Sequence, residues 1–401
     1  MRLAVVSPFV DRRHGTERAL AELLERLARD YNCEIHLYSQ RVEGISLQLQ
    51  APDSPAKAGG VFWHKVPSIP GPHLLQFLFW FSLNRVCRWR DELFRRASFD
   101  LVFSPGINCS DANVVLVHVL FHKLREISFE KCSPALPKPN FIRRLHRLLY
   151  YALLARLERR IYSARSVALA AVSLRTAGML EKYFRRQGVV VIPNGVDLSY
   201  FCPSARLARR EAARAHWKFG SGEFVLLLIG NDWANKGLPA VLTAMAELAD
   251  TRIRLLVVGS DNVTPWRELA LYVGVLERCV WEPACDDILD AYAAADLYVS
   301  PSREDSFAMP VAEAMACGLP AITSVYAGVS SFLQDGVDSF ILQDPQDAKM
   351  LAKRIRTLLD QPEALLRVGH AATETARQWN WDHSAAAVWE LLQKAFAARR
   401  S

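Results

Sequence analysis

Several signals that would define a function class are missing from this sequence. Its eight cysteines are scattered, with no Cys-x-x-Cys pair and no Cys/His cluster, which argues against a zinc ribbon or a disulfide scaffold. No apolar run approaches the ~20 residues that a membrane-spanning helix requires, and Pro8 interrupts the first apolar run too early for a signal peptide. The absence of a Gly-x-Gly-x-x-Gly motif argues against a dinucleotide-dependent oxidoreductase. We expect a cytoplasmic protein in a reducing compartment.

The composition is that of a globular protein, with 51% hydrophobic and 23% charged residues in 401 positions, enough for two or three domains. The charge is uneven. Residues 1–200 hold 29 Lys and Arg against 17 Asp and Glu, whereas residues 201–401 hold 20 against 25. A basic half joined to an acidic half indicates that one domain meets an anionic partner. No nucleic-acid recognition motif accompanies the charge, so we expect no nucleic-acid partner.

The order of apolar runs predicts an α/β fold. Arg2–Val6 is a short apolar run, a loop with Pro8 follows, and Glu17–Leu27 has apolar residues at helical spacing. Strand, loop and helix in this order open a parallel α/β domain. Similar strand-like runs follow in a first series at Glu34–Tyr38, Leu101–Phe103, Val114–Val117, Val167–Val172 and Val189–Ile192. A second series lies at Phe224–Ile229, Arg254–Val258, Cys279–Trp281, Leu297–Ser300, Ala321–Ser324 and Ser339–Leu342.

Two series of strands predict two doubly wound parallel sheets, and the turn residues of Pro193–Asp197 mark the boundary between them. We expect an N-terminal domain over residues 1–197, a second domain over 198–378, and a helical segment over 379–401 that packs back towards the first. Such sheets bind ligands at the carboxyl ends of their strands, where helix N-termini suit phosphates. The residues alone therefore predict a cleft for a phosphorylated ligand.

The stretch from Ser300 to Pro320 resembles the signature of the retaining GT-B glycosyltransferases of family 4. That signature is an acidic residue and a Glu eight positions later, followed by Gly-x-Pro, and Asp305 and Glu313 stand at this spacing. Three other segments resemble family motifs in the family's order, at residues 14–17, 191–197 and 229–237. The resemblance implies a GT-B fold of two Rossmann-like domains, an N-terminal acceptor domain and a C-terminal nucleotide-sugar domain.

The same resemblance implies roles for individual residues. Glu313 would hold the ribose of the donor nucleotide, Asp305 the donor sugar, and Lys236 the diphosphate. His118, at a strand end, would face the donor sugar, and is preferred to His122. The implied catalytic set is Asp305, His118 and Lys236, and the implied donor-binding set is Gly15, Thr16, Asn231, Lys236, Ser306, Phe307, Ala308 and Glu313. No cofactor or metal is implied, because no Asp-x-Asp follows a strand.

Each assignment has a plainer alternative. The family usually has Glu at the first acidic position, so Glu304 is an alternative to Asp305, although Phe307 and Glu313 favour Asp305. Lys236 could be a surface lysine, Gly15 an ordinary turn residue and His118 a packed core histidine. The family often has an Arg early in the phosphate loop, where this chain has Asn231-Asp232 instead.

Two basic segments of the first half interleave cations with apolar residues, at residues 74–96 and 143–156. This pattern is typical of a surface that lies on an anionic bilayer. The alternative is a pair of core-facing helices with solvated basic faces.

The resemblance implies a retaining glycosyltransferase of the hexosyltransferase type and, with the basic first half, a role in bacterial lipopolysaccharide or exopolysaccharide synthesis. Its partners would be a nucleotide-diphosphate sugar, a glycan or lipid-linked acceptor, and the inner face of the cytoplasmic membrane. The enzymatic alternative is a nucleotide-sugar epimerase or hydrolase on the same fold. The non-enzymatic alternative is a GT-B scaffold that binds glycan or membrane without catalysis.

Overall fold

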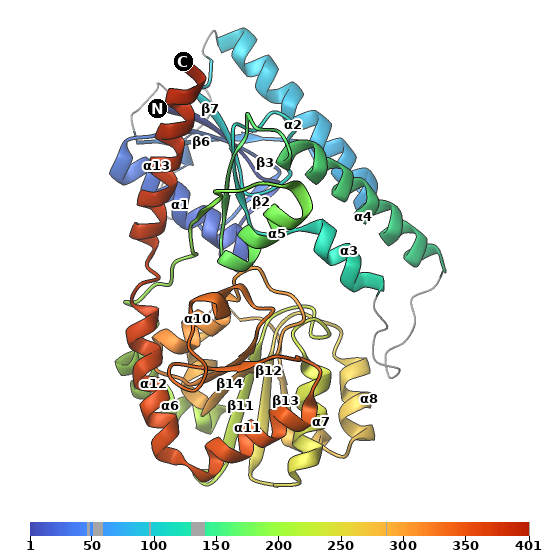
Figure 1. Cartoon of the computed structure of the whole chain (residues 1–401), viewed down its shortest axis with the longest axis vertical. Coiled ribbons are helices and arrows are strands. Elements are labelled where there is room, and N and C mark those ends of the chain that lie inside the picture. The colour runs from blue at the N-terminus through green and yellow to red at the C-terminus, as the bar shows by residue number, and fades with distance from the viewer. Residues whose placement is uncertain (46–48, 51–58, 96–97, 130–140, 286, 401) are drawn as a thin grey trace. The chain divides into compact units, whose positions relative to one another are not determined.

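The computed structural model describes residues 1–45, 49–50, 59–95, 98–129, 141–285 and 287–400 (Figure 1). Within these ranges the chain divides into two compact units. The first holds the residues up to Gly195 and returns for Trp381 onward, and the second holds Val196–Asn380. Each unit contains one large parallel sheet, which confirms the predicted pair of α/β domains.

The sheet of the first unit has strands in the order β10-β9-β8-β7-β1-β3-β6-β5, all parallel. Their bounds are β1 (Arg2–Val6), β3 (Glu34–Ser39), β5 (Leu49–Gln50), β6 (Val61–Lys65), β7 (Leu101–Ser104), β8 (Val114–Val117), β9 (Ala168–Ala171) and β10 (Val190–Val191). A separate two-stranded ribbon joins β2 (Phe9–Val10) to β4 (Arg41–Val42).

Helices cover both faces of this sheet. One face is covered by α1 (Gly15–Tyr31) and by the last helix, α13 (Trp381–Arg400). The other carries α2 (His73–Arg95), α3 (Phe121–Phe129), α4 (Phe141–Tyr162) and α5 (Leu174–Phe184). The Tyr31 and Trp389 rings lie 5.2 Å apart, and Arg26 Nε donates to Asp382 Oδ1 at 2.6 Å. The last helix is thus part of the first unit.

The sheet of the second unit has six parallel strands in the order β13-β12-β11-β14-β15-β16. The strands are β11 (Phe224–Ile229), β12 (Ile253–Val258), β13 (Cys279–Glu282), β14 (Leu297–Ser300), β15 (Ala321–Ser324) and β16 (Phe340–Leu342). The α-helices are α6 (Pro203–His216), α7 (Leu238–Leu248), α8 (Thr264–Tyr272), α9 (Leu289–Ala294), α10 (Met309–Ala316), α11 (Ala348–Asp360) and α12 (Pro362–Ala376), and the 3-10 helices are η1 (Leu276–Arg278) and η2 (Gly328–Phe332).

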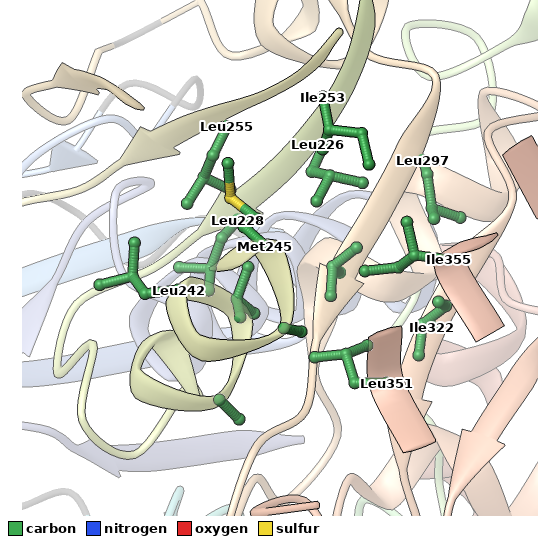
Figure 2. Close-up of a cluster of buried hydrophobic side chains, with 14 of the residues drawn as sticks. Leu226, Leu228, Leu242, Met245, Ile253, Leu255, Leu297, Ile322, Leu351 and Ile355 are labelled. Carbon is green, nitrogen blue, oxygen red and sulfur yellow. The ribbon is translucent and has the colours of Figure 1, made fainter. Parts of the chain in front are cut away.

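The hydrophobic core beneath α7 and α11 shows why the strands read as unbroken apolar runs. Leu226 and Leu228 of β11 point into this cluster, together with Met245 and Ile355 from the two helices (Figure 2). Val225 and Leu227, on the other face of β11, are also buried, because helices cover that face as well. A strand that is buried on both faces has no polar position to alternate with.

Sequence patterning locates the strands of both predicted series to within a residue or two. It does not predict β6, whose run Val61-Phe-Trp-His-Lys65 mixes aromatic and polar residues. None of the helices in the described ranges combines the length and hydropathy needed to cross a membrane.

Candidate functional site

The second unit has a topological switch point between β11 and β14. The two strands are neighbours, but α7 leads from β11 to β12 on one side and α10 leads from β14 to β15 on the other. The loops that follow the two strands, residues 230–237 and 301–308, therefore diverge at the carboxyl edge of the sheet. Open α/β sheets bind their ligands at such a position.

An ion pair joins these loops. Lys236 Nζ donates a hydrogen bond to Asp305 Oδ2, and each side chain is 16% exposed. The backbone adds two bonds nearby. Asn235 O accepts from Arg303 N at 2.8 Å, and Asn235 Nδ2 donates to Glu304 O at 2.7 Å. The structure thus brings together two of the predicted catalytic residues, Lys236 and Asp305, on loops fastened to each other.

The other oxygen of Asp305 binds the start of α10. Asp305 Oδ1 accepts from Ala308 N at 2.7 Å and from Phe307 N at 3.3 Å. Its backbone N–H donates to Tyr326 O at 3.1 Å. Ala308 takes a left-handed conformation, with φ of +69°, which turns the chain into the helix. Asp305 thus already satisfies the two amides that lead into α10.

Two glycines make the approach of the loops possible. A Cβ on Gly230 would lie 2.8 Å from Lys236 Cε, and one on Gly237 would lie 2.3 Å from Pro301 O. Both residues also have positive φ, +139° and +84°, which disfavours L side chains. The path of the Lys236 side chain therefore depends on Gly230.

Glu313 lies within α10 and is 3% exposed. Its Oε2 accepts a hydrogen bond of 2.7 Å from the hydroxyl of Tyr292 on α9. Burial raises the pKa of Tyr292 well above its ordinary value, and the nearby Glu313 raises it further, so the phenol stays a proton donor. The motifs of the sequence do not indicate Tyr292, because α9 carries no recognisable signature.

The remaining donor-binding candidates of this unit differ in their burial and in their hydrogen bonds. Asn231 Oδ1 accepts from Ser260 N at 2.8 Å and so links the loop after β11 to the loop after β12. Ser306 is half-buried and Ala308 is buried. The Phe307 ring is buried, 5.9 Å from the ring of Trp379. The backbone of Phe307 is bonded as well, since its N–H donates to Asp305 Oδ1 at 3.3 Å and its carbonyl accepts from Val329 N at 2.8 Å.

The candidates of the first unit lie at the carboxyl edge of its own sheet. Gly15 opens α1 and is exposed, with Thr16 next to it. His118 directly follows β8 and is 4% exposed. Burial lowers the pKa of His118 to about 4, so its imidazole is neutral near pH 7. Among the described residues, nothing hydrogen-bonds to His118 Nε2.

His122 has a structural role instead. Its Nδ1 lies 2.6 Å from Glu158 Oε2, and its backbone N–H also donates to that carboxylate, at 2.9 Å. The ring packs edge-on against Phe184 at 4.8 Å. His122 thus fastens the start of α3 to the buried Glu158 of α4. As for metals, the part of the chain that the structure describes holds no cluster of three or more His, Cys, Asp or Glu arranged as ligands.

Comparison with known proteins agrees with the fold of two parallel α/β units. Residues 13–200 match the family model Glycosyltransferase Family 4, and residues 209–375 match Glycosyl transferases group 1. A D-inositol 3-phosphate glycosyltransferase of Segniliparus rotundus is 33% identical over 220 residues, covering 52% of this chain and 48% of the relative. The relative of the same name in Thermomonospora curvata is 33% identical over 221 residues, covering 51% and 50%. The matched segment thus spans about half the length of these relatives.

Solved structures share the fold across nearly the whole chain. WaaG, a glycosyltransferase involved in lipopolysaccharide biosynthesis, superposes with a TM-score of 0.77 at 18% identity, covering 97% of this chain and 99% of WaaG. Sucrose-phosphate synthase from Thermosynechococcus elongatus gives 0.75 at 19% identity, covering 99% of each chain. HepE of Anabaena, solved with UDP and glucose, gives 0.69 at 17% identity, covering 98% and 99%. With both halves matched in turn, the chain belongs to the family 4 glycosyltransferases of the GT-B fold.

Proposed function

We propose that this protein transfers a sugar from a nucleotide-diphosphate sugar to a glycan or lipid-linked acceptor, with retention of the anomeric configuration. One observation carries the proposal. A lysine and a carboxylate are paired at the switch point of the second unit, Lys236 with Asp305, and Glu313 lies on the helix that follows. A cation beside an acidic group at the carboxyl edge of such a sheet suits a diphosphate joined to a sugar.

Each of these residues has a role in the proposal. The Lys236 ammonium balances the charge that develops on the departing diphosphate. Asp305 accepts hydrogen bonds from hydroxyls of the donor sugar, and Glu313 accepts them from the ribose. His118 contacts the donor sugar as a neutral imidazole, in keeping with its lowered pKa of about 4. Gly15 and Thr16, at the start of α1, are proposed to contact the donor through backbone amides.

The proposed reaction needs no side chain as a strong base. The bond between the anomeric carbon and the diphosphate oxygen breaks, and the acceptor oxygen forms its bond to that carbon on the same face. The hydroxyl proton of the acceptor passes to the leaving diphosphate. The protein contributes positioning and charge stabilisation. We propose that this chemistry proceeds without a metal, since Lys236 supplies the positive charge.

The proposed acceptor is anionic or lipid-linked. Residues 1–200 hold 29 Lys and Arg against 17 Asp and Glu, a charge that attracts phosphorylated molecules. The curated relatives are named for D-inositol 3-phosphate, and WaaG for lipopolysaccharide biosynthesis. We therefore propose a phosphate-bearing or lipid-anchored glycan acceptor, used in lipopolysaccharide or exopolysaccharide synthesis at the cytoplasmic face of the membrane.

A thermal-shift experiment tests the donor site. The protein is heated with UDP, GDP, ADP, CMP or dTDP, first in EDTA and then in magnesium. A ligand at 100 times its Kd adds about 2.7 kcal/mol of stability, so the matching nucleotide raises the Tm visibly. We expect one nucleoside diphosphate to do so in EDTA. Stabilisation in magnesium alone would contradict the metal-free reaction, and no shift with any nucleotide would favour a non-catalytic scaffold.

The matching nucleotide sugar is then incubated with D-inositol 3-phosphate and with lipid-linked glycans, and the product anomer is read by NMR. Transfer with retention is the expected result. Release or epimerisation of the sugar without any acceptor would identify a hydrolase or an epimerase instead.

A further inference from the structure

Helix α2 of the first unit turns polar side chains towards the protein interior. Asn84, Arg88 and Asp91 are each 6% exposed or less. All three are held by the rest of the unit. Arg88 donates to both oxygens of Asp111 at 2.8 and 3.0 Å, and Asn84 Nδ2 donates to the carbonyl of Asn108 at 3.1 Å. Asp91 accepts from the Tyr38 hydroxyl at 2.9 Å and is paired with His64 at 2.7 Å.

The opposite side of α2 is apolar and open to solvent. Its exposed residues follow each other at intervals of three, four or eight along the chain, so they form one stripe on the helix. The apolar members are between 42% and 61% exposed, and they are Leu75, Leu78, Val86, Trp89 and Leu93. Phe94, beside the stripe, is 77% exposed. A helix on the surface of a monomeric protein normally has the reverse arrangement.

Helix α4 extends this surface. The two helices lie side by side (Figure 1), with the Phe77 and Tyr150 rings 6.1 Å apart and Leu74 N donating to His146 Nε2 at 3.4 Å. Leu145 and Leu149 of α4 are 44% and 54% exposed.

Positive charge surrounds the apolar residues. The cations with exposed side chains on the two helices include Arg85, Arg90, Arg144, Arg147 and Arg156. The sole acid in the sequence of α4 is the buried Glu158, and α2 exposes Glu92 but buries Asp91. An apolar stripe between arginines matches the acyl chains and the headgroups of an anionic bilayer.

We propose that this α2/α4 surface docks on an anionic lipid membrane, with α2 lying in the plane of the interface. Trp89 and Leu93 enter the boundary between headgroups and acyl chains, and Arg85 and Arg90 contact lipid phosphates. The buried contacts of Asn84, Arg88 and Asp91 hold the helix in this orientation. Membrane binding does not depend on the glycosyl transfer proposed above, although it would bring a lipid-linked acceptor to the enzyme.

A second copy of this chain fits the surface less well than a membrane. In a two-fold symmetric dimer the same patch lies on both sides of the interface. The arginines of one copy would then face those of the other, and like charges opposed across an interface disfavour association. An anionic lipid surface instead places negative headgroups opposite all the arginines of the α2/α4 surface.

The test is co-sedimentation of the full chain with vesicles. One set is phosphatidylcholine alone and the other contains about one third phosphatidylglycerol, which gives the surface a negative potential. We expect binding to the second set, weakened at high salt. Trp89→Ser with Leu93→Ser should reduce the affinity about tenfold or more, and so should Arg85→Glu with Arg90→Glu.

The matched control changes exposed apolar residues of the second unit, with Leu271→Ser and Leu366→Ser, which are 66% and 77% exposed in the native chain. It should bind vesicles like the wild type. Every variant should keep the wild-type Tm and nucleotide-induced shift, because the changed side chains are exposed and lie outside the donor site. Loss of vesicle binding is therefore distinguishable from failure of the proposed catalytic function.

Three results would overturn the proposal. They are a wild type that does not bind anionic vesicles, stripe variants that bind as well as the wild type, and a wild-type dimer that the stripe changes dissociate. Sedimentation velocity without lipid detects the third.

Discussion

The ammonium group of Lys236 donates to Oδ2 of Asp305 across 69 residues of sequence, from one side of the switch point to the other. The positive charge expected to meet a diphosphate is thus already balanced by the carboxylate expected to meet the sugar. In the proposed site, an arriving donor would compete with Asp305 for Lys236. Substitutions of Lys236 and of Asp305 should therefore change the affinity for the nucleotide in opposite directions.

Removing the cation should weaken nucleotide binding. Lys236→Met should lower the affinity for the matching nucleoside diphosphate about tenfold or more, since a hydrogen bond to a charged group contributes about 1.5–3 kcal/mol. Isothermal titration calorimetry measures the change. Lys349→Met removes an exposed lysine of α11 in the same unit and should leave binding unaltered. Equal affinities for the Lys236 variant and the wild type would remove Lys236 from the donor site.

Removing only the charge of Asp305 should strengthen the binding of a nucleoside diphosphate that carries no sugar. Asp305→Asn keeps an oxygen for the amides of Phe307 and Ala308 but no longer neutralises Lys236. We expect the nucleoside diphosphate to bind several-fold tighter, by roughly 1 kcal/mol, while sugar transfer slows. Weaker nucleotide binding by this variant would show that the ion pair does not compete with the ligand.

The loop glycine provides a steric test of the same site. Gly230→Ala puts a methyl group 2.8 Å from Lys236 Cε at a positive φ, so Lys236 should be displaced. We expect a loss of about 1–2 kcal/mol in unfolding free energy together with weaker nucleotide binding. The matched control is Gly222→Ala, where nothing lies within 4 Å of the added Cβ. Native nucleotide affinity in Gly230→Ala would argue against a precise placement of Lys236.

Two substitutions of Glu313 should distinguish its proposed role in nucleotide binding from its contribution to stability through Tyr292. Glu313→Gln should weaken nucleotide binding, because it removes the charge proposed to bind the ribose. Its Tm should change little, because Gln retains an oxygen for the Tyr292 hydroxyl. Glu313→Ala leaves that buried hydroxyl without its 2.7 Å partner, which should cost about 1–3 kcal/mol as well. Thermal denaturation with and without nucleotide distinguishes the two effects. If Glu313→Gln binds nucleotide normally, the ribose assignment is wrong.

His118 should make the first unit sensitive to acid. The pKa of its imidazole falls from 6.5 to about 4 on burial, so the unfolded chain takes up a proton at a higher pH than the folded one. Its stabilisation is complete above about pH 6.5 and is lost as the pH falls towards 4. Between pH 8 and pH 5 the loss is about 2 kcal/mol.

Urea unfolding at the two pH values, for the wild type and for His118→Gln, measures this contribution. The variant should lose about 2 kcal/mol less than the wild type over the interval. His73→Gln, at an exposed histidine of α2, should lose as much as the wild type. Parallel pH profiles for the wild type and His118→Gln would mean that His118 titrates normally in the folded protein.

Sequence patterning predicts the fold well because parallel strands covered on both faces carry uninterrupted apolar runs, as in Phe224–Ile229. Local motifs also single out Lys236 and Asp305, which the structure joins in an ion pair. Sequence patterning does not predict Tyr292, which meets Glu313 only after α9 and α10 pack together. Nor does it predict that the amides of Phe307 and Ala308 are bound by Asp305, because that depends on a single turn geometry.

The orientation of α2 is beyond sequence patterning for a similar reason. Residues 74–96 show aromatic residues among arginines, and both a membrane surface and a core-facing helix fit that pattern. Trp80 is buried, as a core-facing helix requires, but Trp89 is 61% exposed and Arg88 points inward. What decides the orientation is Asp111 and Tyr38, which lie on distant segments.

The return of the chain to its first unit also bears on how the protein is made. The Trp389 ring packs on Tyr31, and Arg399 Nη1 donates to the Asp100 carbonyl at 2.9 Å. The first unit therefore remains incomplete on the ribosome until the last helix emerges, whereas Val196–Asn380 is already synthesised in full. The second unit can thus fold before the first, which is completed only once α13 has been synthesised.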